Sequence, residues 1–446
     1  MAKYQKYAEY KDSGIVWMGN VPSHWTSERF KWLLTEKLKT SNHDLPAGSI
    51  SFGEVVYKNE DNLAFETKAS YQEVLKDEFL INPLNLNYDL KSLRTGLSEI
   101  NVVVSTGYIV LHCDNFLDRR YVRWLLHEFD VSHMKTLGAG VRQTVNFSDI
   151  ANCYFYLPSD LEQNQIANFL DHETAKIDSL IAKQEKLIEL LKEKRQAVIS
   201  HAVTKGLNSD VTLKDSGVEW LGQVPEHWRV CRLKHVGYIQ SGIAKGKDLT
   251  DKTSISVPML RVANVQDGYL NLNEVHQIDI EPQQLERYLL QDGDVLMNEG
   301  GDNDKLGRGT VWRSEIPNCI HQNHVFAIRT TEIESEWLDI LTRASYAKFH
   351  FFRQSKQSTN LASISATNIK ETPILVPPKD EREEIRNYLK EQFDRFSKLE
   401  NRCYQQVELL KEHRTALISS AVTGKIDVRN WQQPNKNNEA KTEFGA

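Results

Sequence analysis

The sequence lacks the features of a disulfide-rich protein, a zinc protein or a membrane protein. Its 446 residues include only five cysteines, which are widely scattered and form no CxxC pair. Neither a disulfide framework nor a cysteine zinc site is therefore expected. No run of about eighteen apolar residues occurs, and the polar N-terminus has no signal-peptide core. We expect a cytoplasmic protein without a membrane span, and its length predicts two or three domains.

The sequence also lacks a recognisable active site. The segment Gly242–Asp248 has the wrong spacing for a phosphate-binding loop and no hydroxyl after its lysine. The NPLN segment at Asn82 is only weakly similar to the NPP[FY] motif of adenine methyltransferases, and no glycine-rich cofactor loop precedes it. We therefore expect a non-catalytic chain that binds no metal ion and no cofactor. The formal net charge of −6 gives no overall basic excess of the kind that many nucleic-acid-binding proteins have.

Two blocks of the sequence occur twice, in the same order. Lys11–Trp25 recurs as Lys214–Trp228 with ten of fifteen positions identical, at an offset of 203. Ile188–Thr204 recurs as Val407–Thr423 with twelve of seventeen identical, at an offset of 219. The stretches between the blocks differ in sequence. This pattern predicts an internal duplication with a pseudo-two-fold repeat.

The second repeated block ends two long stretches that contain neither proline nor glycine, at about 161–204 and 381–423. Apolar residues recur there at spacings of three and four, which predicts amphipathic helices with a coiled-coil seam. Gly206 and Gly424 should end them. About 44 residues correspond to about 66 Å of helix, so we expect the two helices to pack antiparallel, with the variable domains at opposite ends. The alternative is a separate helix hairpin that closes each domain. The expected seam comprises Ile177, Leu180, Leu187, Leu191 and Val198, with Phe396, Leu399, Cys403, Leu410 and Leu417.

The predicted fold class is α+β, because the variable segments mix short β-rich runs with helical stretches. The first repeated block combines glycine, proline and tryptophan, which favours an irregular connecting strap anchored by its aromatic rings. The expected layout is a strap at 1–25, a first variable domain at 26–158, a central long helix at 159–206, a repeated strap at 207–228, a second variable domain at 229–377, a C-terminal long helix at 378–428 and a disordered tail at 429–446.

Polar loops of both variable segments carry side chains that suit DNA. Arginine and lysine fit the guanine edge and asparagine and glutamine the adenine edge, while lysine, arginine, serine and threonine also contact phosphates. Any single loop of this kind is more often an ordinary solvated loop, so the weight comes from its recurrence in both halves. The expected DNA-contacting residues are Asn85, Asn87, Lys91, Arg94, Arg142, Gln143 and Thr144 in the first domain and Asn298, Lys305, Arg308, Gln354, Lys356, Gln357 and Asn360 in the second.

This organisation resembles the specificity subunits of type I restriction–modification enzymes. The resemblance rests on the DSGxxWxGxVPxHW strap, the ELLKExR helix that ends in AVT, and the GDxxxNxGG-like and RQT/QST loops, and it covers about residues 10–428. It implies two target-recognition domains separated by repeated helical regions. Each domain would read one half of an asymmetric bipartite site on double-stranded DNA, and the helices would set the spacer.

The resemblance also implies a set of partner proteins. Two modification (methyltransferase) subunits would flank one copy of the chain, and restriction subunits with translocase and nuclease activity would join them. S-adenosylmethionine, ATP and magnesium would belong to those partners. Two other functions stay open at this point: a stand-alone DNA methyltransferase or nuclease, and a coiled-coil scaffold that binds only proteins.

Overall fold

The computed structural model describes residues 4–51, 53–84, 93–113, 117–138, 144–244, 253–301, 306–357 and 362–434. The chain divides into two compact units. Unit 1 comprises Met1–Gln184 and Gln405–Ala446, and unit 2 comprises Glu185–Tyr404. Each unit therefore contains the beginning of one long helix and the end of the other. No helix in the described part of the chain is long and apolar enough to span a membrane.

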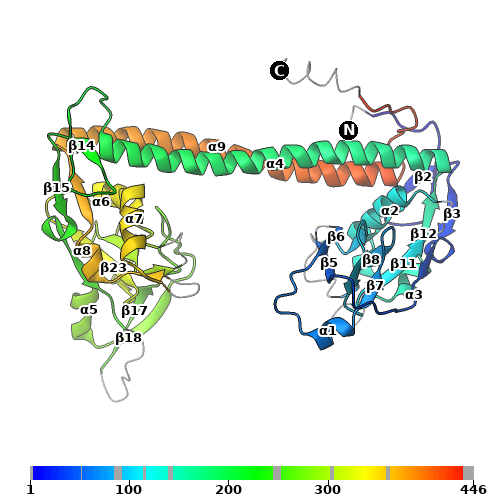
Figure 1. Cartoon of the computed structure of the whole chain (residues 1–446), viewed down its shortest axis with the longest axis horizontal. Coiled ribbons are helices and arrows are strands. Elements are labelled where there is room, and N and C mark those ends of the chain that lie inside the picture. Colours follow the sequence, from blue (N-terminus) through cyan, green and yellow to red (C-terminus); the bar gives the residue numbers. More distant parts are fainter. Residues whose placement is uncertain are drawn as a thin grey trace. The chain divides into compact units, whose positions relative to one another are not determined.

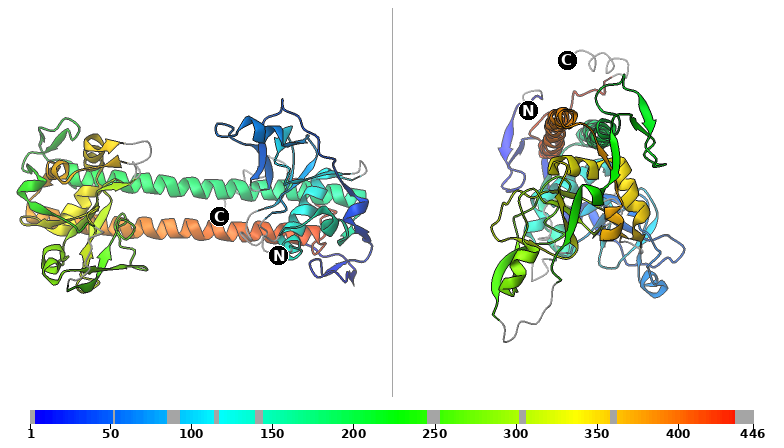
Figure 2. Two further views of the ribbon diagram at one scale, coloured as in Figure 1. Left: turned by 90° about the horizontal axis from the view of Figure 1, so that it is seen from below. Right: turned by 90° about the vertical axis from the view of Figure 1, so that its left-hand side faces the viewer.

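The two long helices are α4 (Asp160–Lys205, 46 residues) and α9 (Lys379–Val422, 44 residues). Both are continuous, and they run side by side (Figures 1 and 2). The first part of α4 packs on the last part of α9 in unit 1, and the reverse holds in unit 2. The predicted antiparallel pair is thus confirmed, and neither helix folds back into a separate hairpin.

Equivalent arginines connect the helices in both units. In unit 1 Arg414 Nε donates to Asp178 Oδ1 at 2.8 Å. In unit 2 Arg195, which precedes Arg414 by the repeat offset of 219 residues, lies 3.7 Å from Glu400 Oε2. Between the helices, Ile188, Leu191, Phe396 and Cys403 form a buried apolar cluster. The helix pair therefore has the two-fold character that the duplicated sequence predicts.

Each strap folds into a short β-hairpin. β1 (Tyr10–Asp12) pairs with β2 (Asn20–Pro22), and β13 (Leu213–Asp215) pairs with β14 (Gln223–Pro225). Gly19 and Gly222 adopt positive φ angles of 61° and 69° in the turns, a conformation that glycine adopts without strain. The following tryptophans, Trp25 and Trp228, are fully buried in the main core of their units.

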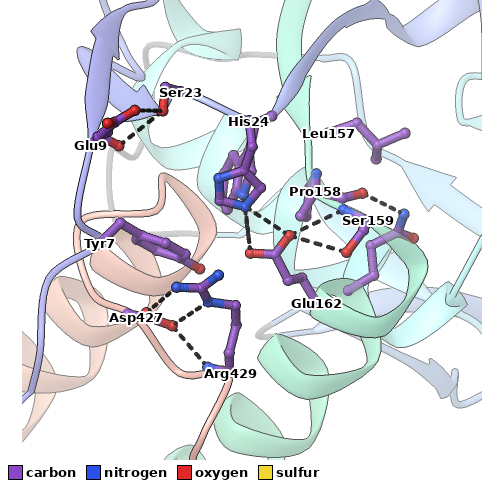
Figure 3. Close-up of polar contacts among 12 residues, drawn as sticks. Tyr7, Glu9, Ser23, His24, Leu157, Pro158, Ser159, Glu162, Asp427 and Arg429 are labelled. Atoms are coloured by element: carbon purple, nitrogen blue, oxygen red, sulfur yellow. Dashed lines mark hydrogen bonds and ion pairs between the residues drawn. The ribbon is translucent and has the colours of Figure 1, made fainter.

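A glutamate near the start of each long helix holds the strap in place. In unit 1 His24 Nε2 lies 3.0 Å from Glu162 Oε1 (Figure 3). The Trp25 indole N–H donates to the same oxygen at 3.5 Å. In unit 2 His227 Nε2 lies 2.8 Å from Glu381 Oε2, and Trp228 Nε1 donates to the same oxygen at 3.1 Å. We call these two sets of contacts the His–Glu–Trp clasps.

Segments from near the two ends of the chain complete the clasp of unit 1. The backbone N–H of Asp427 donates to the Gln5 carbonyl at 2.8 Å. The Arg429 guanidinium binds Asp427 and lies over the Tyr7 ring, with its carbon 4.9 Å from the ring centroid (Figure 3). In unit 2 the corresponding position is crossed by the uninterrupted chain between α4 and β13.

The variable domain of unit 1 is built on a six-stranded sheet in the order β4-β11-β8-β9-β6-β5. Helix α2 (Arg119–Ser132) lies beside this sheet (Figure 1). Its Tyr121, Trp124 and Phe129 rings are buried in the main core of the unit. The strands are β4 (Leu34–Glu36), β5 (Gly48–Ser51), β6 (Glu54–Tyr57), β8 (Phe79–Ile81), β9 (Thr95–Leu97) and β11 (Ile109–Cys113). The remaining elements are β3 (Thr26–Arg29), which pairs with β12 (Tyr154–Leu157), β7 (Gln72–Val74), which pairs with β10 (Val102–Val104), and the short helices α1 (Phe65–Ala69) and α3 (Phe147–Ala151).

The variable domain of unit 2 has a four-stranded sheet in the order β16-β23-β19-β21. Its strands are β16 (Gly237–Ser241), β19 (Val295–Asn298), β21 (Gly309–Val311) and β23 (Val325–Thr330). Separate small sheets contain β15 (Arg229–Arg232) with β26 (Pro373–Val376), β17 (Ile255–Leu260) with β18 (His276–Ile280) and β22 (Ile320–His321), and β20 (Gly300–Gly301) with β25 (Ala362–Ser363) and β24 (Lys356–Gln357). The helices are α5 (Pro282–Tyr288), α6 (Ser335–Arg343), α7 (Ser345–Gln354) and α8 (Ala366–Lys370).

The two variable domains share a framework that their sequences do not reveal. In both, the first strand of the central four pairs with the fourth, the fourth with the second, and the second with the third, always antiparallel. The strands β4-β11-β8-β9 thus correspond to β16-β23-β19-β21. The α+β class and the internal repeat are confirmed, and the repeat extends into the variable segments.

Candidate nucleic-acid interface

The two predicted loops of unit 1 meet beside the ends of β8 and β9. The Asn82 backbone N–H, just after β8, donates to the Arg94 carbonyl, just before β9, at 2.7 Å. The Val145 N–H donates to the Pro83 carbonyl at 3.2 Å. The fold therefore brings Arg94 and the neighbourhood of Thr144 to one place, although about fifty residues separate them in sequence.

Unit 2 repeats this arrangement with different side chains. The Asn298 N–H donates to the Arg308 carbonyl at 3.0 Å, and the Ile364 N–H donates to the Glu299 carbonyl at 2.9 Å. The small sheet β20-β25-β24 then joins the glycine pair Gly300–Gly301 to the strand that carries Lys356 and Gln357. The same two loops converge in both units because the same two backbone contacts hold them.

The two halves share a short sequence pattern at this framework, which a search for known motifs does not find. Asp77 and Gly293 both have positive φ, of 71° and 88°. Each is followed two residues later by a buried strand, β8 or β19, in the sequences EFLIN and DVLMN, in which Asn82 and Asn298 hold the same position. The offset between these positions is 216, intermediate between the offsets of the two repeated blocks, which explains why a search at either fixed offset does not align them.

Apart from Asn298, the predicted DNA-contacting residues divide into three groups by position. Gln354, Lys356 and Gln357 are exposed, and Arg94, Thr144 and Arg308 are half-buried. For these six residues a contact with DNA stays a prediction. The other calls lie outside the described residues: Asn85, Asn87, Lys91, Arg142, Gln143, Lys305 and Asn360.

Asn298 lies in the interior rather than at the surface. Its side chain is fully buried, and Nδ2 donates to the Val265 carbonyl at 2.9 Å and to the Val262 carbonyl at 3.3 Å. A buried amide that is hydrogen-bonded to backbone in this way costs several kcal/mol to withdraw, because its partners would be left unpaired. The expected base contact at Asn298 is therefore replaced by a structural role, in which the side chain fixes the backbone next to the loop.

A buried carboxylate lies under the loop of unit 1. Asp130 on α2 is fully buried, and it accepts a hydrogen bond from the Arg94 backbone N–H. Burial raises the pKa of Asp130 to about 6, although the Arg94 N–H and the charges of Lys135 and Arg94 act in the opposite direction. The carboxylate is thus ionised at neutral pH at an energetic cost, close to where the loop leaves the sheet.

The described residues contain no group of three or more histidine, cysteine, aspartate or glutamate side chains that could hold a metal ion. What the geometry offers is a pair of equivalent loop platforms, each on its own sheet. Such platforms can present side chains to the grooves of a duplex.

A family model for the type I restriction modification DNA specificity domain matches residues 225–409. The EcoKI type I specificity subunit of Escherichia coli (strain K12) is 24% identical over 283 residues, which cover 63% of this chain and 59% of that subunit. The putative MjaX type I specificity subunit of Methanocaldococcus jannaschii is 24% identical over 207 residues, 46% of this chain and 47% of that protein. The chain thus matches about half to three-fifths of the length of these relatives.

A solved structure described as the basis of complex assembly and conformational transition of the type I R-M system superposes with a TM-score of 0.65. It is 16% identical, and the match covers 90% of this chain and 98% of that one. The fold and the duplicated loop platforms define a protein with two α+β domains and a pair of long antiparallel helices. Over residues 225–409 the chain is similar to the DNA specificity domain of type I restriction–modification enzymes, and the relatives it resembles are specificity subunits.

Proposed function

We propose that this chain is the DNA sequence-recognition subunit of a type I restriction–modification enzyme. Each recognition domain reads one half of an asymmetric, bipartite site on double-stranded DNA. The observation that carries the proposal is the pair of loop platforms: two domains of different sequence hold the same two loops together with equivalent backbone hydrogen bonds. A shared frame with different loop side chains is what reading two different half-sites requires.

The chain acts as a non-catalytic subunit in this proposal. Two modification subunits bind one copy of it, and restriction subunits join the complex. S-adenosylmethionine, ATP and magnesium are bound by those partners. The duplicated straps and clasps support the stoichiometry, because two equivalent surfaces on one chain suit two copies of one partner.

The helix pair sets the distance between the half-sites. Both helices are continuous, and they are joined in each unit by a buried seam or equivalent ion pairs. Two modules that read one face of B-DNA have to lie about one helical turn, 34–36 Å, apart or a multiple of it. A rigid pair of helices is suited to holding such a distance.

A domain exchange tests the proposal. Residues 26–157 are replaced by the corresponding domain of another family member, and the chimera is produced with the modification subunit. Methylated positions are then mapped by long-read sequencing. We expect one half-site to change while the other half-site and the spacer stay the same, and the converse exchange of residues 229–376 should change only the other half.

Three results would contradict the proposal. An exchange that alters both half-sites would show that the domains do not read independently. Methylation or cleavage of DNA by the purified chain alone would favour a stand-alone enzyme. A complete lack of DNA binding in the presence of the modification subunit would favour a scaffold that binds only proteins.

A further inference from the structure

An equivalent pair of basic residues follows each strap, with the arginine at the end of the first strand and the lysine in the one-turn 3-10 helix after it. Arg29 and Lys31 in unit 1 correspond to Arg232 and Lys234 in unit 2 at the strap offset of 203. The local backbone is also equivalent, because the Phe30 N–H donates to the Cys153 carbonyl at 3.3 Å and the Leu233 N–H donates to the Thr372 carbonyl at 3.0 Å. The two basic pairs therefore occupy the same place in their units.

In unit 2 a carboxylate fills this place. Glu371, at the end of α8, binds the Arg232 guanidinium through Oε2 and accepts a hydrogen bond from Lys234 Nζ at 2.7 Å through Oε1. The hydrogen bond from Lys234, together with Arg232, lowers the pKa of Glu371. The site in unit 2 is thus satisfied from within the chain.

In unit 1 the corresponding position holds no acid. Asn152 takes the place of Glu371, and its Oδ1 lies 3.4 Å from Lys31 Nζ. In the described part of the chain, no carboxylate pairs with Arg29 or Lys31. Arg29 binds the Tyr154 hydroxyl instead, with its guanidinium carbon 4.3 Å from the Tyr154 ring centroid and 6.0 Å from that of Trp32.

The surface around Arg29 has the composition of a protein interface. Trp32 is 54% exposed and Tyr154 43% exposed, and both lie beside two uncompensated positive charges. Tryptophan, tyrosine and arginine are the residue types most enriched among the dominant contacts of protein–protein interfaces. Unit 2 has Pro373 where unit 1 has Tyr154, so this aromatic and basic surface is specific to unit 1.

We propose that Arg29, Lys31, Trp32 and Tyr154 form a docking site for an acidic segment of a partner protein. One carboxylate of the partner binds between Arg29 and Lys31, as Glu371 does in unit 2, and an adjacent apolar side chain packs on the two rings. The contacts of Glu371 in unit 2 show that this pair of basic residues binds a carboxylate. Among the residues that the structure describes, the basic pair lacks such a carboxylate only in unit 1, so this partner binds once per chain.

Reciprocal substitutions test the site. Asn152→Glu should supply the carboxylate from within unit 1, and Glu371→Asn should open the equivalent basic pair of unit 2. The backbone accommodates both changes, because residues 152 and 371 have nearly the same conformation, φ −88° and ψ −8° against φ −89° and ψ 0°. Neither variant removes a group from the loop platforms.

The probe is a short fluorescein-labelled peptide in which glutamates alternate with leucines, and binding to the full chain is measured by fluorescence anisotropy at low salt. We expect the peptide to bind the natural chain, and Asn152→Glu to weaken it by about tenfold or more, in line with a charged hydrogen-bonded contact. Arg29→Gln with Lys31→Gln should do the same, whereas Glu371→Asn should add a weaker second site. Melting temperatures at or above that of the natural chain show that Asn152→Glu does not act by unfolding.

Four outcomes would overturn the proposal. They are equal binding of a control peptide with glutamine in place of glutamate, unchanged binding by Asn152→Glu, and no detectable peptide binding to the natural chain. The fourth is that Asn152→Glu weakens the binding of a non-target DNA duplex but not the binding of the peptide. That result would assign the site to DNA phosphate.

Discussion

The two recognition domains differ at their periphery while their central strands agree. Unit 1 extends its sheet with β5 and β6, whereas unit 2 has a separate sheet of β17, β18 and β22 beside its four central strands. The agreement covers the four central strands, the strand pairs β3–β12 and β15–β26, and the two straps. The comparison shows that the framework is maintained by backbone hydrogen bonds and burial, which many sequences satisfy, and that the loops and outer strands are free to diverge.

The largest expected effect comes from lengthening the pair of long helices, α4 and α9, to which both units contribute. Four residues are inserted into α4 after Leu187 and four into α9 after Gln406, since positions 187 and 406 are equivalent in the repeat. The insertion adds about 6 Å of helix, so we expect methylation of the original site to be lost and a site with a spacer about two base pairs longer to be used. Long-read methylation mapping measures this, and an unchanged spacer would refute the role of the helices in setting it.

The clasps give the next largest effect, and they should differ between units. Glu162 is almost fully buried in unit 1, whereas the Glu381 side chain is 24% exposed. Glu162→Ala leaves His24 and the Trp25 indole without their partner, so we expect a loss of about 2–3 kcal/mol in the free energy of unfolding, and a smaller loss for Glu381→Ala. Urea unfolding measures both, with the exposed Glu9→Ala as the control. Equal losses would show that burial does not distinguish the two clasps.

The clasp of unit 1 should also respond to acid. Burial works to raise the pKa of Glu162, but hydrogen bonds from His24, Ser159 and Trp25 outweigh it, and the pKa is lowered below 4.5. A lowered folded-state pKa stabilises the protein above the unfolded value, and this contribution is lost as the pH falls through the folded value. The difference between the natural chain and Glu162→Gln should therefore be constant near neutral pH and shrink below about pH 4. A difference that grows on acidification would contradict this.

Asp130 should behave in the opposite way. Its folded pKa of about 6 lies above the ordinary value of 3.8, so ionisation costs stability, which falls as the pH rises from about 4 to 6. Asp130→Asn retains an acceptor for the Arg94 N–H and removes the charge. We expect it to stabilise the chain by about 1–3 kcal/mol at pH 7 and to have little effect at pH 4. Thermal melting at both pH values measures the change, and destabilisation at pH 7 would contradict it.

The smallest effect is expected at a single exposed loop residue. Lys356→Ala removes one positive charge from β24, so DNA binding by the assembled complex should weaken by up to about tenfold, with a decrease of about one in the salt-dependence slope. The methylated sequence should stay the same if the lysine contacts phosphate. Lys186→Ala, on the exposed surface of α4, is the matched control and should change neither quantity.

The long helices could be predicted because their apolar spacing and terminal glycines are strong local signals. The width of the buried seam between the two helices could not be predicted from the sequence. Ile177, Leu191 and Cys403 are buried as predicted, but Leu187 and Leu399 on the same expected stripe are 44% and 43% exposed. In a pair of helices each stripe faces only one neighbour, so residues at its edge stay in contact with solvent.

The candidate interface could be predicted only in outline. Polar residue types located the loops, and the fold brings those loops together in each unit. The same reading assigned Asn298 to the DNA surface because an asparagine suits a base edge, yet its side chain is buried and its amide nitrogen donates to two backbone carbonyls inside the domain. Whether a polar side chain faces inward depends on which backbone groups tertiary folding leaves unpaired nearby, and this information is not local in sequence.

The pairing of Gln5 with Asp427 means that the chain should tolerate circular permutation. A short linker from residue 434 to residue 4, with a break between Asn208 and Ser209, would leave every strand and helix of both units uncut. Such a permuted gene would encode the second recognition domain before the first. The two half-sites and their spacing should be unaffected. The junction is formed by contacts between residues, and these contacts do not depend on the order in which the segments are joined along the chain.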